Sequence, residues 1–508
     1  MQKMSFTFNN SYARELPGFY ERCAPEQVRE PRLLFVNHML AEELLLDLAS
    51  YDAPTQAAIF SGNRLLEGAE PIAQVYAGHQ FGHFSAQLGD GRALLVGEVM
   101  DRQGRRCDIA FKGSGRTPFS RSGDGKAAVG PMLREVLIGE SMHALGIPTT
   151  RALAVVSTGE SVYREQALPG AVLTRVAASH VRVGTFEFFA ARGDYDRVRK
   201  LVEYTIARHD AELVGTQERC IEFLQAVMRR QSALVAQWMG VGFIHGVMNT
   251  DNMSIAGETI DYGPCAFMET YNPKAVFSSI DEHGRYAYEN QPRIAQWNLA
   301  RLAETLLPLL SDDEQSALAL ASDVVDAFPG IYRQHWLNVM RAKLGLNRQV
   351  EDGDQIDTTL AEEWLSLLQT NHVDFTLAWR RLADAAEGHL SALMDLFSDH
   401  PALNAWLIKW KARCAAEDND ANDAASQQSH TSAFARAEGM RRVNPWLIPR
   451  NHHVEEALAA ASDEGNLEPF HQLLAALKRP YEETPALARY AEPAPTAFTA
   501  SYRTFCGT

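Results

Sequence analysis

Hydrophobic residues follow two different spacings along the chain. Between residues 82 and 177, short alternating runs separated by glycine and polar turn residues predict strands. These are two strands over 85–98 joined at Gly89-Asp90-Gly91, and others at 107–112, 152–157, 161–164 and 171–176. Pro131 stands where a first helical residue belongs, and residues 132–145 have helical spacing. This stretch therefore predicts a small β-rich unit with one inserted helix.

Helical spacing dominates beyond residue 178. Apolar residues recur at three- and four-residue intervals, and a similar run lies near the N-terminus. The predicted helices cover 38–51, 195–212, 220–239, 296–310, 313–327 and 359–368. Between them, residues 243–263 predict two short strands around a hairpin at Ala256-Gly257. Residues 415–432 are acidic and low in apolar content, which favours a solvated loop.

These patterns divide the chain into four parts. We expect an N-terminal extension (1–70), a β-rich lobe (71–177), a mainly helical lobe (178–395) and a C-terminal helical extension (396–508) that contains the acidic loop. Strands and helices that are segregated in this way predict an α+β fold.

Composition excludes several classes of protein. The chain has 508 residues with a net charge of −16, which disfavours nucleic acid as the main partner. Its six scattered cysteines form no C-x-x-C pair, so a disulfide framework is excluded and a reducing compartment is favoured. The N-terminus lacks a secretory pattern, and apolar runs such as 221–235 are too short and too charged to span a membrane. We therefore expect a cytoplasmic protein without a membrane partner.

An ordered set of residues points to phosphate chemistry. Lys112 ends a predicted strand, Glu135 lies on the following helix, a loop runs from His245 to Asn252, and Asp261-Tyr262-Gly263 follows the predicted hairpin. Each element alone is ordinary. Together they match the order of protein-kinase parts: strand Lys, helix Glu, catalytic-loop Asn and the Asp of D-F-G. The set therefore predicts a kinase-like bilobal fold.

The chemistry of these residue types is coherent. Asn252 and Asp261 offer hard oxygen ligands for a Mg²⁺ ion, while Glu135 would hold the Lys112 ammonium toward the phosphates. Residues 102–134 contain eight basic residues and two acidic ones, and we expect this stretch to supply the positive field of the site. One part departs from the kinase pattern. Val247 stands where the catalytic-base Asp belongs, and Asp251 is the nearest replacement.

Longer motifs resemble the selenoprotein O family of pseudokinase protein adenylyltransferases. They are Tyr76-Ala-Gly-His-Gln-Phe-Gly82, Gln87-Leu-Gly-Asp-Gly-Arg92, residues 111–126, Thr174-Arg175 with residues 179–187, residues 245–253, and Cys506 third from the C-terminus, where some members carry selenocysteine. The resemblance covers most of the chain. It implies ATP bound in an orientation inverted relative to kinases, with AMP transferred to Ser, Thr or Tyr hydroxyls of protein substrates.

The same resemblance implies roles for individual residues. Asp251 would accept the proton, Asn252 and Asp261 would bind Mg²⁺, with Mn²⁺ as an alternative, and Glu135 would pair with Lys112. The implied ATP contacts are Gly89, Gly91, Arg92, Lys112, Asp124, Gly125, Arg175, Arg182 and Asp261. Oligomeric state stays open, with a monomer as the expectation.

Other interpretations remain. The chain could be a binding-only pseudokinase, or a phosphotransferase that uses Asp251 as its base. His79 and His83 have a spacing that could hold zinc, but no Glu follows His79 as the H-E-x-x-H motif requires. Cys265 and Cys506 could form a redox-sensitive pair, against the simpler interpretation of one buried and one free thiol.

Overall fold

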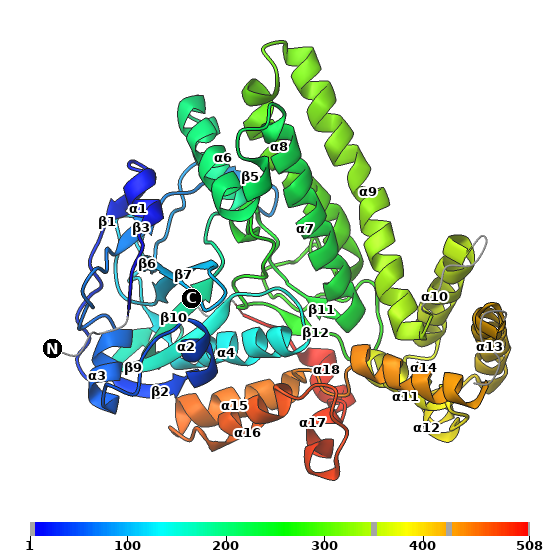
Figure 1. The fold of residues 1–508 in the computed structure, drawn as a ribbon. Coiled ribbons are helices and arrows are strands. Elements are labelled where there is room, and N and C mark those ends of the chain that lie inside the picture. The colour runs from blue at the N-terminus through cyan, green and yellow to red at the C-terminus, as the bar shows by residue number, and fades with distance from the viewer. Residues whose placement is uncertain (1–5, 347–352, 423–428, 506–508) are drawn as a thin grey trace.

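An eight-stranded antiparallel sheet organises the N-terminal half of the molecule (Figure 1). The computed structural model describes residues 6–346, 353–422 and 429–505. The strands follow the spatial order β1-β3-β6-β7-β10-β9-β2, and β8 pairs with β10. Their bounds are β1 (Tyr20–Arg22), β2 (Arg32–Val36), β3 (Ile72–Gln74), β6 (Ala93–Met100), β7 (Arg106–Lys112), β8 (Ala127–Ala128), β9 (Arg151–Tyr163) and β10 (Ala167–Ala177). Two small sheets pair β4 (Gly78–Gln80) with β5 (His83–Ser85), and β11 (Phe243–Ile244) with β12 (Ala266–Phe267).

Strand β7 lies in the middle of the large sheet. Lys112 at its end faces Ala93 of β6 on one side and Leu173 of β10 on the other. Its neighbours Ile109, Ala110 and Phe111 are buried, as expected for a strand covered on both faces. The predicted strand at 107–112 is therefore confirmed, and it fixes Lys112 on a rigid element.

Two strand predictions were wrong in detail. The segment 85–98 is not a hairpin, because β6 pairs with β3 and β7 while β5 pairs with β4. The Gly89-Asp90-Gly91 turn is instead held by Asp90, whose carboxylate accepts a hydrogen bond from the Gln74 amide at 3.0 Å. The strands predicted at 152–157 and 161–164 are one strand, β9, which continues past Gly159 because that glycine adopts a φ of 71° within the strand.

Helix α4 (Val129–Ala144) packs against the large sheet, with Pro131 in its first turn. The helix predicted at 132–145 is thus confirmed. Met132, Leu133, Val136 and Leu137 are all buried. From below in Figure 1, α15 and α16 of the C-terminal region cover this helix.

Helices dominate the rest of the chain (Figure 1). The α-helices outside the sheet region are α1 (Ser11–Glu15), α2 (His38–Glu43), α3 (Ala53–Phe60), α5 (Val183–Ala190), α6 (Tyr195–His209), α7 (Arg219–Val241), α8 (Gln291–Leu310), α9 (Glu314–Leu344), α10 (Gly353–Thr370), α11 (Phe375–Ala386), α12 (Ser391–Met394), α13 (His400–Asn422), α14 (Ser429–Val443), α15 (Asn451–Asp463), α16 (Glu468–Leu477), α17 (Ala488–Ala491) and α18 (Thr496–Ser501). Together with the antiparallel sheets they form a mixed α+β fold, as predicted.

Some helix bounds and the predicted hairpin differ from the structure. The helix expected at 38–51 ends at Glu43, and a separate helix, α3, follows it. Helix α7 passes through Gly240 and ends at Val241, where it is capped by Gly242 with a φ of 73°. Gly240 is there for packing, since a Cβ at this position would lie 2.6 Å from Cγ1 of Val339 on α9. The hairpin at Ala256-Gly257 is a turn whose flanks bridge other segments, Ser254 with Arg182 and Thr259 with Thr149.

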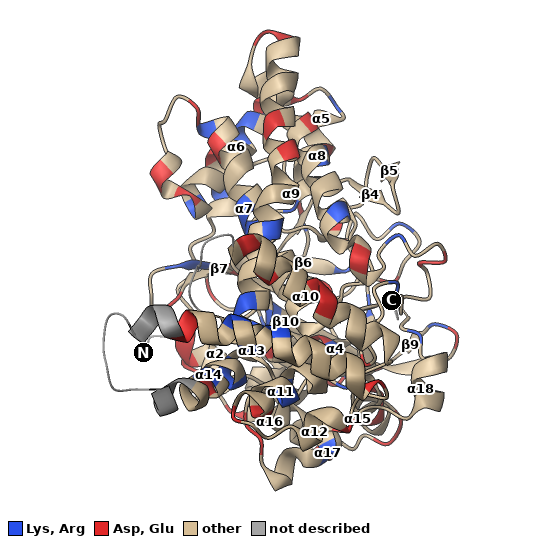
Figure 2. Cartoon of the chain, turned by 90° about the vertical axis from the view of Figure 1, so that its right-hand side faces the viewer, with Lys and Arg blue, Asp and Glu red and all other residues tan. Residues whose placement is uncertain are grey.

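The acidic segment 415–432 was predicted as a loop, and this was wrong for most of it. Helix α13 continues to Asn422 and α14 begins at Ser429, while residues 423–428 lie outside the described part of the chain. On the face shown in Figure 2, acidic and basic residues are interspersed along the helices. Among the described helices, none combines the length and apolar character needed to cross a bilayer.

Lys343 near the end of α9 is a buried cation. Its ammonium lies 4.8 Å from the ring centroid of Trp379, and no carboxylate pairs with it within the described residues. Burial lowers the pKa of Lys343 to about 7. The unfolded chain binds the proton up to about pH 10.4, so the charge destabilises the fold most at and below pH 7.

We predict that Lys343→Met raises the melting temperature at pH 7. The free energy of unfolding should rise by up to a few kcal/mol, less the contribution of the lost cation–π contact. This gain should shrink as the pH rises toward 10. Thermal unfolding between pH 6 and 10 measures this. A gain that stays constant with pH would contradict the assigned cause.

Candidate functional site

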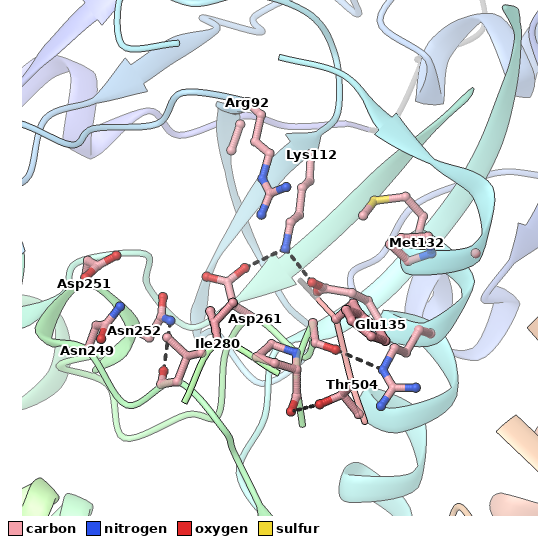
Figure 3. Close-up of a pocket in the computed structure, with 18 of the residues that line it drawn as sticks. Arg92, Lys112, Met132, Glu135, Asn249, Asp251, Asn252, Asp261, Ile280 and Thr504 are labelled. Carbon is pink, nitrogen blue, oxygen red and sulfur yellow. Dashed lines mark hydrogen bonds and ion pairs between the residues drawn. The ribbon is translucent and has the colours of Figure 1, made fainter. Parts of the chain in front are cut away.

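A cavity of about 590 Å³ opens where the end of β7, helix α4 and the segment 247–264 meet (Figure 3). Arg92, Lys112, Arg175 and Arg182 line it from the sheet side, while Asn249, Asp251, Asn252 and Asp261 line it from the opposite segment. The structure thus brings together most of the predicted site residues, from strands, a helix and loops far apart in sequence.

Lys112 is fixed by two carboxylates. Its Nζ lies 2.5 Å from Oε1 of Glu135 and 2.7 Å from Oδ1 of Asp261. Lys112 and Glu135 are both buried, so each needs the other to offset the loss of hydration. The predicted pair between strand and helix is therefore present in the structure.

Asp261 is the centre of a larger charge cluster. Nη1 of Arg175 also lies 2.7 Å from its Oδ1, and Nη1 of Arg182 lies 4.0 Å from its Oδ2. Burial opposes the charged form, but these three cations hold the pKa of Asp261 well below its usual range. Its backbone has a φ of 63°, a conformation that non-glycine residues rarely adopt. Asp261 is therefore an ionised carboxylate held in a strained turn.

Each arginine is oriented by further contacts. Nε of Arg175 donates to Nε2 of His180 at 3.2 Å, and Nδ1 of His180 lies 3.0 Å from Oδ2 of Asp108. These bonds require His180 to be neutral with its proton on Nδ1. Arg182 stacks on Tyr76, with 4.4 Å from its Cζ to the ring centroid, and donates to the backbone carbonyl of Asp251 at 3.0 Å. Arg175 and Arg182 are therefore held in place by their neighbours.

The two carboxylate oxygens of Asp251 differ in their hydrogen bonding. Nε2 of Gln80 donates to its Oδ2 at 3.2 Å, whereas its Oδ1 is buried and has no hydrogen-bond partner within the described structure. Burial raises the pKa of Asp251 to about 6, against the opposing charge of Arg182. Because the Asp251 side chain lines the cavity, a carboxylate with this raised pKa is suited to accept a proton from a bound hydroxyl.

Asn252 and Asp261 both face the cavity (Figure 3). Nδ2 of Asn252 donates to the Val247 carbonyl at 3.0 Å, which leaves its amide oxygen as the acceptor available to a ligand. The described residues contain no cluster of three or more His, Cys, Asp or Glu side chains that could hold a metal. Two oxygen donors suit a Mg²⁺ ion that takes its remaining ligands from phosphate and water.

Comparison with known proteins now identifies the family. The family model described as protein adenylyltransferase SelO matches residues 2–478. The chain belongs to the SelO family. Among relatives called protein nucleotidyltransferase YdiU, that of Chromobacterium violaceum is 56% identical over 494 residues (97% of this chain and 100% of the relative). That of Cereibacter sphaeroides is 57% identical over 506 residues (99% and 100%), and that of Rhizobium meliloti 53% identical over the same span. This SelO family member is therefore an enzyme of the nucleotidyltransferase class.

In this SelO family member, only some of the glycine-loop residues predicted to contact ATP line the cavity. Gly91 lines it, and Gly89 packs so closely on Phe119 that a Cβ would lie 2.4 Å from the ring. Gly125 packs on the backbone of Gly115, where a Cβ would lie 2.0 Å from the carbonyl oxygen. Asp124 pairs with Arg164 at 2.8 Å and does not line the cavity.

The expectation that residues 102–134 supply the positive field was wrong in detail. Of their eight basic residues, only Lys112 and Arg134 line the cavity. Arg134 is occupied by backbone carbonyls of Tyr262, Gly263 and Cys265. Arg92, Arg175 and Arg182 make up most of the cationic wall instead, because strand pairing places β6 and β10 on either side of β7.

The structure argues against the zinc site and leaves the cysteine pair untested. Nδ1 of His79 lies 2.5 Å from Glu187 and His83 is exposed, which is unlike a zinc pair. Cys265 is buried, its thiol donates to the Tyr262 carbonyl at 3.2 Å, and burial raises its pKa to about 11. Cys506 lies outside the described residues, so their pairing stays a hypothesis.

Sequence reasoning missed the role of the β4–β5 hairpin. The His79 amide donates to Thr250 Oγ1 at 2.7 Å, Gln80 to Asp251, and the Phe81 amide to Asn249 Oδ1 at 3.1 Å. The hairpin thereby fixes three successive residues of the loop that carries Asp251. Its motif was noticed in the sequence, but long-range pairing of this kind leaves no local pattern.

Gly78 offers a test of this arrangement. A Cβ there would lie 2.7 Å from Oδ1 of Asp251, so we predict that Gly78→Ala displaces the carboxylate and lowers nucleotidyl transfer by roughly 10²-fold or more, with little change in melting temperature. Gly330→Ala on α9, where the Cβ would meet open space, is the matched control. Full activity of Gly78→Ala would show that the position of Asp251 is unimportant.

Proposed function

We propose that this enzyme transfers AMP from ATP to Ser, Thr or Tyr hydroxyls of protein substrates and releases pyrophosphate. The observation that carries this is the Asp251 carboxylate, which lines the same cavity as Arg92, Lys112, Arg175 and Arg182. Valine stands at residue 247, where a kinase has its base. The base is thus displaced along the loop relative to kinases. This displacement supports an acceptor hydroxyl directed at the α-phosphorus of an inverted nucleotide.

The site also supports a kinase-like arrangement. The Lys112–Glu135 pair joins a strand and a helix, and His245 holds the loop that follows by donating to the Ile260 carbonyl at 2.9 Å. We propose that strands β3 to β10 and α4 correspond to the small lobe (71–177) and the helices after residue 178 to the large lobe. Residues 1–70, which add β1 and β2 at the two edges of the sheet, and residues 396–508 would be additions. We further propose that the enzyme acts as a monomer in the cytoplasm, where ATP and protein substrates are available.

In the proposed reaction, the acceptor O–H gives its proton to the Asp251 carboxylate while its oxygen forms a bond to the α-phosphorus. The bond from this phosphorus to the bridging oxygen of the β-phosphate breaks, and pyrophosphate leaves. Lys112, Arg92, Arg175 and Arg182 would neutralise its growing charge. Asn252 and Asp261 would hold Mg²⁺ or Mn²⁺, which when bound offsets further phosphate charge.

Labelled ATP distinguishes the candidate functions. We predict that protein is labelled by ATP carrying the isotope at the α position and stays unlabelled when it is at the γ position. Label from the γ position would instead indicate phosphotransfer with Asp251 as base. Nucleotide binding without any transfer would indicate a binding-only pseudokinase.

Asp251→Asn tests the proposed base with almost no change in volume. We predict that ATP affinity is largely kept while turnover falls roughly 10²–10⁴-fold, because the amide cannot accept the proton. Asp395→Asn, at an exposed position after α12, is the control. A parallel loss of ATP affinity would assign Asp251 to metal or nucleotide binding.

A further inference from the structure

A second hollow of about 510 Å³ adjoins the catalytic cavity. The two share Phe81 and Ile280, and the second is formed by residues 280–285 and the first turns of α8. We call it the outer groove. An acceptor segment with its hydroxyl at Asp251 can extend into this groove without crossing the cationic wall, because that wall lies on the sheet side of the cavity.

Arg285 is the notable side chain of the outer groove. Its guanidinium lies 4.8 Å from the ring centroid of Trp297 and 5.7 Å from that of Tyr286. Its Nε is buried without a hydrogen-bond partner, and no carboxylate forms an ion pair with Arg285 in the part of the chain that the structure describes. A guanidinium near aromatic rings that has no carboxylate partner can direct its terminal N–H groups to a carboxylate of a ligand.

Among the described residues of the outer groove, no other charged side chain pairs with the Arg285 guanidinium. The two oxygens of Asp281 accept the backbone amides of Arg285 and Tyr286 at 2.9 and 2.8 Å, so this carboxylate is committed to the turn. Glu282 and His283 are exposed on the same loop. Arg293 on α8 adds a second exposed cation, which also has no ion pair among the described residues.

The groove is tied to the catalytic loop. The Tyr286 hydroxyl donates to Oδ1 of Asn249 at 2.6 Å, and the same oxygen accepts the Phe81 amide. The rings of Phe81 and Tyr286 lie 5.2 Å apart. Because Asn249 is two residues before Asp251, the position of Arg285 is fixed relative to the proposed base. A ligand held by Arg285 is therefore held in register with the acceptor hydroxyl.

We propose that the outer groove is the docking site for the acceptor protein, and that Arg285, supported by Arg293, binds an Asp or Glu side chain near the modified hydroxyl. This inference rests on the proposed function, because it takes the acceptor to enter at Asp251. Two parallel, charge-assisted hydrogen bonds from a guanidinium to a carboxylate contribute both affinity and orientation.

Synthetic peptides with one Ser, Thr or Tyr, and a single Glu, Ala or Lys scanned along the flanks, test this proposal. We predict that wild-type enzyme has a lower KM for peptides with Glu at one preferred offset. Arg285→Met should raise that KM about tenfold or more, while KM for ATP and kcat on the Ala peptide stay unchanged. Arg285→Glu should shift the preference to Lys peptides. Arg333→Met, at an exposed arginine of α9 that forms an ion pair with Glu362 of α10 at 3.7 Å and does not line either cavity, is the control.

Anisotropy with the labelled Glu and Ala peptides, in the presence of a non-hydrolysable ATP analogue, gives a readout without transfer. Tighter binding of the Glu peptide by wild type, lost in Arg285→Met, supports the docking site even if the transferred group is not AMP. Equal binding of both peptides, or the same preference in wild type and Arg285→Met, would overturn it. Melting curves of each variant exclude a folding defect.

Discussion

The sharing of one carboxylate among three cations is the constraint on which the site depends. Asp261 takes Lys112 from β7, Arg175 from β10 and, more distantly, Arg182 from the start of α5. Without it, three positive groups would face one another in a largely buried space, at a cost of several kcal/mol. The cluster therefore ties the sheet to the 247–264 segment, and it leaves the cavity with excess positive charge suited to a triphosphate.

Successive ion pairs and hydrogen bonds behind this cluster explain how the strained backbone of Asp261 is tolerated. The φ of 63° at Asp261 is stabilised by ion pairs whose other ends are themselves fixed, Lys112 by Glu135 and Arg175 by His180 and Asp108. Arg208 continues the chain of contacts to Asp108 at 2.5 Å and to Glu98 at 2.7 Å. The geometry of the reacting groups is thus determined by buried polar networks reaching deep into the sheet.

Sequence predicted the parts of this site that lie on regular elements. The strand ending in Lys112 and the helix carrying Glu135 show clear periodicity, and the Asn252 and Asp261 motifs have fixed spacing. It failed where long-range contacts decide: the stretch 85–98 was mistaken for a hairpin because glycine marks both turns and buried loops. Segment 415–432 was mistaken for a loop because a solvated helix needs no apolar stripe. Gln80 lies in a recognisable motif, but nothing local revealed its contact with Asp251, and Arg285 had no local signal.

The C-terminal helices reach the catalytic site through helix α4. Helices α15 and α16 cover α4, and Arg134, next to Glu135, lies 3.2 Å from Glu455 of α15. These contacts hold α4 in place and so support the position of Glu135 beside Lys112. The geometry of the Lys112–Glu135 ion pair therefore depends in part on the C-terminal end of the chain, far from both residues in sequence.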